Sequence, residues 1–111
     1  MEITEFQINS ATVLGLSGRL DGLTSATVEG KVGTLIAGGT QKLVIDCAQL
    51  VYVSSAGLRV FLSSAKKMKA GGGKLAFAAL TPAVQDAFEL SGFASILTVH
   101  PTADAAASAL G

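Results

Sequence analysis

Side chains that ordinarily perform catalysis are scarce in this sequence of 111 residues. It contains one cysteine, Cys47, one histidine, His100, and no tryptophan. One cysteine cannot form an internal disulfide, and one cysteine with one histidine cannot supply the four ligands of a structural zinc site. A serine–histidine–aspartate triad would have to use His100, near the end of the sequence. We therefore expect no catalytic activity, no metal and no cofactor.

Charge is also scarce. Eight basic residues balance eight acidic ones, and charged residues make up 14% of the chain, against about 25% in typical soluble domains. This composition excludes a disordered charged tail, and zero net charge argues against nucleic acid as a partner. No apolar run approaches the roughly 18 residues of a membrane span, and the start lacks the basic and apolar regions of a signal peptide. We expect a cytoplasmic protein without membrane insertion.

Half of the residues are apolar, which is enough for one hydrophobic core in a chain of this length. We therefore expect residues 1–111 to form a single domain. Its apolar pattern predicts the order ββαβαβαβα, with a hairpin turning at Asn9-Ser10 and strands over 3–8, 11–17, 42–47, 75–80 and 95–99. Helices are expected to start at Thr24 or Ser25, after Ser54-Ser55, at Thr81-Pro82 and at Pro101-Thr102. This alternation predicts an α/β fold with a mixed, mostly parallel central sheet and helices packed against it.

In open α/β sheets, functional sites lie beyond the carboxyl ends of the strands. Two predicted loops meet that condition, residues 18–23 and residues 49–57. Ser54 and Ser55 stand in the second loop, and either hydroxyl can cap the helix that follows. Alternatively, one of them accepts a phosphate, which the helix N-terminus and its dipole would stabilise. Arg59, one turn beyond Ser55, is placed for a charge-assisted hydrogen bond to such a phosphate.

Asp21 stands in the first loop, immediately before a glycine. Aspartate before glycine is ordinary turn chemistry. The alternative is that Asp21 faces the same surface as Ser55 and contacts a partner or orients the serine hydroxyl. Residues 71–74, Gly-Gly-Gly-Lys, suggest a phosphate loop only superficially, because the first glycine and the final Ser/Thr of that motif are missing. They are interpreted as a helix stop.

The sequence around these residues resembles the STAS domain, found in bacterial anti-sigma factor antagonists and at the cytoplasmic end of sulfate transporters. The resemblance runs from about Ile3 to the final helix. Four segments carry it: Leu16-Ser17-Gly18-Arg19-Leu20-Asp21, Leu43-Val44-Ile45-Asp46, Tyr52-Val53-Ser54-Ser55-Ala56-Gly57-Leu58-Arg59 and Ser91-Gly92-Phe93. The third segment is the most specific.

The resemblance implies that the chain is an anti-sigma factor antagonist that works by partner switching. The unphosphorylated form would bind an anti-sigma factor that is also a serine kinase of the GHKL ATPase type. Phosphorylation would break the complex, and a PP2C-type phosphatase would reset it. The phosphoacceptor of the family falls on Ser55. Ser54 stands where the best-known members carry an aspartate, and is a second candidate. The implied partner-binding residues are Asp21, Gly22, Ser54, Ser55, Gly57 and Arg59.

Two other functions remain open within the same fold. STAS proteins also serve as accessory subunits of lipid-export transport ATPases, which would predict stable co-purification with an ATPase and no phosphate on Ser55. A stressosome-like scaffold component is the other alternative, although such chains usually carry a further domain. An enzyme is disfavoured by the single histidine and the absence of a phosphate loop.

Overall fold

The computed structural model describes residues 1–111 and contains one five-stranded sheet in the order β1-β2-β3-β4-β5. The strands are β1 (Glu2–Ile8), β2 (Ala11–Leu20), β3 (Lys42–Val53), β4 (Lys74–Ala78) and β5 (Val99–His100). β1 is antiparallel to β2, and every other neighbouring pair is parallel. The predicted order ββαβαβαβα and the mixed, mostly parallel sheet are confirmed.

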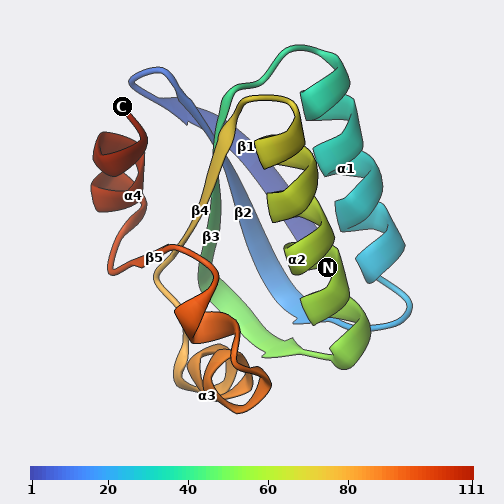
Figure 1. Cartoon of the computed structure of the whole chain (residues 1–111). Helices are drawn as coiled ribbons and strands as arrows, with labels where there is room; N and C mark the ends of the chain where they lie inside the picture. Colours follow the sequence, from blue (N-terminus) through green and yellow to red (C-terminus); the bar gives the residue numbers. More distant parts are fainter.

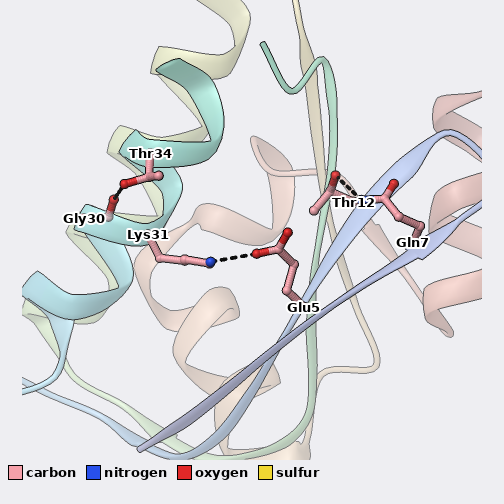
Figure 2. Close-up of polar contacts among 6 residues, drawn as sticks. All are labelled: Glu5, Gln7, Thr12, Gly30, Lys31 and Thr34. Carbon is pink, nitrogen blue, oxygen red and sulfur yellow. Dashed lines mark hydrogen bonds and ion pairs between the residues drawn. The ribbon is translucent and has the colours of Figure 1, made fainter. Parts of the chain in front are cut away.

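The N-terminal hairpin turns at Asn9 and Ser10, as predicted, and pairs Ile8 with Ala11. Asn9 has a φ of 55°, in the left-handed region that asparagine tolerates better than most residues. β1 is the edge strand and is largely exposed. An ion pair of 2.7 Å between Glu5 of β1 and Lys31 of helix α1 (Ser25–Ala37) ties this edge to the helical layer (Figure 2). Because both side chains are partly exposed, the pair contributes at most about 1 kcal/mol.

Helices cover both faces of the sheet (Figure 1). α1 and α2 (Ser55–Ala70) lie on one face, while α4 (Ala103–Leu110) lies on the other. Neighbouring residues of a strand point to opposite faces, so that Leu14 and Ile45 belong to the larger core cluster under α1 and α2, whereas Val13 and Val44 pack against α4. The central strands are thus buried on both sides, as parallel strands usually are.

Helix α3 (Pro82–Ser91) closes one end of the larger core cluster through Val84 and Phe88. The ring of Phe61 in α2 lies 4.8 Å from that of Phe77 in β4, and the Phe77 ring lies 5.5 Å from that of Phe88. These aromatic contacts join α2, β4 and α3. The sequence prediction of Pro82 at the first helical position of α3 is confirmed.

Two predicted loops are shorter than expected. β2 continues through Gly18 and Arg19 to Leu20, and β3 continues through residues 48–53, so half of the predicted loop 18–23 and five of the nine residues of the predicted loop 49–57 are strand. The pairing of β2 with β3 shifts register twice, between Gly15 and Ser17 and between Gly18 and Arg19. Such irregularities break the period-two pattern by which strands are detected. The strand expected over 95–99 is also wrong in extent, since residues 93–95 form a short 3-10 helix, η1, before β5.

Candidate functional site

Strands β2 and β3 end side by side and lead into the two turns that carry the candidate residues. Leu20 and Val53, the last residues of these strands, are paired in register. The Ser54 N–H donates a hydrogen bond of 2.8 Å to the Leu20 carbonyl. Asp21 and Ser54 follow these two strand ends directly, and both turns lie at the lower end of the sheet in Figure 1. The two segments that the sequence singled out therefore meet at the same end of the sheet.

The two adjacent serines have different roles in the structure. Ser54 is extended, with φ −87° and ψ 174°, and its hydroxyl accepts a hydrogen bond of 3.2 Å from the Gly57 N–H. It is the N-cap of α2. Ser55 is the first residue of the helix and is exposed. Capping, which the sequence allowed for either residue, belongs to Ser54, and this leaves the Ser55 hydroxyl at the surface.

Gly57 allows the first turn of α2 to pack closely on the two strands. It is buried, and a Cβ built at this position would lie 2.8 Å from both Leu20 Cγ and Val53 Cγ2. The first turn of α2 therefore packs directly on the ends of β2 and β3, at a distance that only glycine permits. A buried residue offers little surface to a partner. Gly57 positions Ser55 and does not belong to the exposed surface.

Asp21 organises its own turn. Its Oδ1 accepts hydrogen bonds from the Leu23 N–H at 3.0 Å and the Thr24 N–H at 3.3 Å. These bonds, of which the one from Leu23 matters most, lower the pKa of Asp21 below its usual value. Helix α1 starts at Ser25 with Thr24 as its N-cap residue, as predicted. The Thr24 side chain makes no capping hydrogen bond, however, because its hydroxyl donates to the Arg19 carbonyl at 2.8 Å. The turn interpretation of Asp21 is confirmed. No hydrogen bond joins its carboxylate to Ser55.

We expect Asp21→Ala to lower the melting temperature by a few degrees at pH 7, because the Leu23 and Thr24 N–H groups in the turn before α1 lose their acceptor. The pKa of Asp21 is lower in the folded than in the unfolded chain. Its stabilising effect is therefore complete above the unfolded value of about 3.9 and is lost as the pH falls through the lower folded value. Thermal unfolding followed by circular dichroism at pH 7 and near pH 3 should show the difference between wild type and variant shrinking in acid. Asp86→Ala, which removes an exposed carboxylate outside any turn, is the control. A difference that grows in acid would contradict this assignment.

The ends of β2 and β3 and the turn after β2 carry exposed residues that the sequence did not single out. Leu23, in the turn after Asp21, is 91% exposed. The Arg19 guanidinium lies 4.2 Å from the centre of the Tyr52 ring, across the paired ends of β2 and β3. Leu23 could have been selected from the sequence, because it is an apolar residue within a predicted turn. The contact between Arg19 and Tyr52 depends on the strand register, which the sequence does not show.

Of the predicted partner-binding residues, Gly22, Ser55 and Arg59 are exposed and Asp21 and Ser54 are half-buried. Arg59 stands one helical turn after Ser55.

The remaining reactive groups lie elsewhere. Cys47 is buried in the larger core cluster, and this burial raises the pKa of its thiol and keeps the sulfur protonated. No group of three or more His, Cys, Asp or Glu side chains is arranged to hold a metal. None of the helices combines the length and the apolar character that a membrane crossing requires.

Several known proteins that are similar to this chain are named as anti-sigma factor antagonists. BtrV of Bordetella bronchiseptica, named as an anti-sigma factor antagonist, is 35% identical over 109 residues, which cover 98% of this chain and 94% of BtrV. The crystal structure of an anti-sigma factor antagonist from Mycobacterium paratuberculosis is 25% identical, with a TM-score of 0.89 over 98% of this chain and 92% of that one. SpoIIAA of Bacillus in its phosphorylated form shares the fold, with a TM-score of 0.75 and 18% identity over 99% of this chain and 100% of SpoIIAA. The model of the STAS domain matches residues 4–106, and the chain belongs to the STAS domain family.

Proposed function

We propose that this protein is an anti-sigma factor antagonist that acts by partner switching, with Ser55 as its phosphoacceptor. The observation that carries the proposal is the position of Ser55, exposed at the first residue of α2 beside the turn of Asp21. The names of the relatives support the function. In the unphosphorylated state, the surface formed by Asp21, Gly22, Ser55 and Arg59 binds an anti-sigma factor that is also a kinase of the GHKL ATPase type.

The kinase transfers the γ-phosphoryl group of ATP to the Ser55 Oγ, with release of ADP and loss of the hydroxyl proton. The product is suited to its position, because free N–H groups and the helix dipole favour an anion at a helix N-terminus. Arg59, one turn further along the helix, provides a cation on the same side. Since Ser54 caps α2, modification of Ser55 leaves the cap in place. The switch therefore works through charge and needs no unfolding of the helix.

The local charge of α2 makes this change large. Arg59 is the one charged residue in the first eleven residues of the helix, and the three lysines follow near its C-terminal end. A phosphate carries about −1.5 to −2 at neutral pH, and would reverse the charge of this end of the helix. A surface that binds the unmodified end would then meet a negative charge, and the phosphorylated chain would leave it. A PP2C-type phosphatase hydrolyses the phosphoester and restores the first state.

Intact-mass measurement tests the phosphoacceptor. The protein is incubated with ATP and a candidate GHKL-type kinase, and we expect the mass to increase by one phosphate. Ser55→Ala should abolish the increase, because the accepting oxygen is gone. Ser54→Ala should keep it, although this variant loses the cap of α2 and melts at a lower temperature. Equal labelling of wild type and Ser55→Ala would overturn the assignment. Stable co-purification with a transport ATPase, without phosphate on Ser55, would instead favour the accessory-subunit function.

A further inference from the structure

A concave surface lies toward the opposite end of α2 from Ser55. β5 pairs only with Phe77 and Ala78 of β4, so the first residues of β4, Lys74–Ala76, have no strand on that side. A cavity of about 400 Å³ lies along this open edge, between the C-terminal part of α2 and the end of α4. Ser55 and Lys69, which lines the cavity, are 14 residues apart, or about 21 Å along the helix axis. The cavity is therefore separate from the surface around Ser55.

The lining of this cavity is apolar at its base and basic at its rim. Leu97 and Leu110 are each only 7% exposed, and Leu75 packs against the larger core cluster. Two exposed lysines, Lys69 and Lys74, stand beside these side chains, and no acidic side chain lines the cavity. Its volume lies in the lower part of the range of small-molecule sites, which are mostly apolar with a few polar groups. This combination suits a ligand with an apolar body and an anionic head group.

His100 adds an independent indication. His100 also lines the cavity, and its Nε2 is the one buried side-chain nitrogen or oxygen in the structure that has no hydrogen-bond partner. Buried polar atoms are nearly always paired, and an unpaired one calls for a missing partner. Nε2 has almost no exposed surface of its own, so it donates as an N–H to a carboxylate or phosphate oxygen only when the bound ligand turns the ring toward the cavity. The same head group would meet the ammonium groups of the two lysines.

We propose that this cavity binds a small amphipathic anion, with a carboxylate or phosphate head held by Lys69, Lys74 and His100. Its apolar tail lies on Leu75, Leu97 and Leu110. This site is independent of the phosphoacceptor and of the proposed partner switching. It would make the protein a receptor for a second signal.

A titration followed by NMR tests the proposal on the whole chain. Sodium octanoate and octyl phosphate are the two probes, and octanol, acetate and inorganic phosphate are the matched controls that lack the charge or the tail. We expect the methyl signals of Leu75, Leu97 and Leu110 and the ring signals of His100 to shift, with a Kd on the order of 0.1–1 mM for at least one probe. The two probes distinguish a carboxylate head from a phosphate head.

The double variant Lys69→Glu/Lys74→Glu should weaken binding at least tenfold, while Lys66→Glu, on the same helix but outside the cavity, should not change it. Backbone spectra that superpose with those of the wild type show that each variant is folded. The proposal is overturned if octanol binds as tightly as octanoate, if acetate or inorganic phosphate binds as tightly as the matching probe, or if the shifts map outside the cavity.

Discussion

Ser55→Asp is expected to weaken binding to the anti-sigma kinase at least tenfold, whereas Ser55→Ala should bind as tightly as the unphosphorylated wild type. The aspartate places a fixed negative charge on the first residue of α2, at the centre of the proposed contact. The core of a protein interface is depleted in charge, and a mismatched charge there costs several kcal/mol. A fraction of that cost in binding free energy already exceeds the 1.4 kcal/mol that corresponds to a tenfold change in Kd. Isothermal titration calorimetry with purified kinase and without ATP measures this directly.

The matched control adds the same charge away from the site. Ser108 is exposed on α4, which covers the opposite face of the sheet, and Ser108→Asp should leave the Kd unchanged. If both aspartate variants weaken binding equally, the effect arises from net charge and Ser55 is not at the contact. If neither weakens it, the charge at Ser55 does not control the complex, and the switching mechanism is wrong even if Ser55 is phosphorylated.

Gly57→Ala should destabilise the protein by about 1–3 kcal/mol, as overpacking of a filled core typically does. The added methyl group would lie 2.8 Å from both Leu20 Cγ and Val53 Cγ2, so α2 or the two strand ends must move. Because this movement displaces Ser55 from the turn of Asp21, kinase labelling of the variant should slow as well. Chemical denaturation measures the first effect, and the initial rate of phosphate incorporation measures the second.

A second glycine provides a control for which the expected change in stability has the opposite sign. Gly33 lies within α1, and a Cβ built there meets no atom within 4 Å. Gly33→Ala should therefore stabilise the protein by up to about 1 kcal/mol through helix propensity alone. The same chemical change in two helices would then have opposite effects. If Gly57→Ala also stabilises the protein, the close contact of α2 with the strand ends is not a constraint on the fold.

The sequence was sufficient to predict the fold because hydrophobic periodicity and helix boundaries agreed. Pro82 begins α3, Gly71 and Gly92 follow α2 and α3, and the short apolar runs in β3 and β4 are buried on both faces. The prediction was poorer where the backbone is irregular. After Cys47 only every third residue of β3 is buried, a spacing that is not typical of a strand, and the polar residue Gln49 then looks like part of a loop. Only the pairing with β2 shows that the strand continues.

The candidate site was predictable in part for the same reason. Local chemistry identified the turn of Asp21 and the serines at the start of α2, because each depends on a few neighbouring residues. It did not separate the capping serine from the exposed one, since both satisfy the same sequence preference. The packing role of Gly57 and the contact between Arg19 and Tyr52 arise across the paired ends of β2 and β3. Interactions of that kind require the register of the sheet.

The antiparallel pairing of β1 also decides where a label should be attached. Glu2 pairs with Ser17, and Met1 lies against Gly18, close to the strand end that leads to Asp21. The C-terminus lies at the other end of the molecule (Figure 1), where Leu110 lines the cavity beside Lys74. An affinity tag or fluorophore on Met1 would crowd the surface around Ser55, and one on Gly111 would crowd the cavity. Binding to a kinase is therefore best measured with the C-terminal fusion, and binding of an amphipathic anion with the N-terminal one.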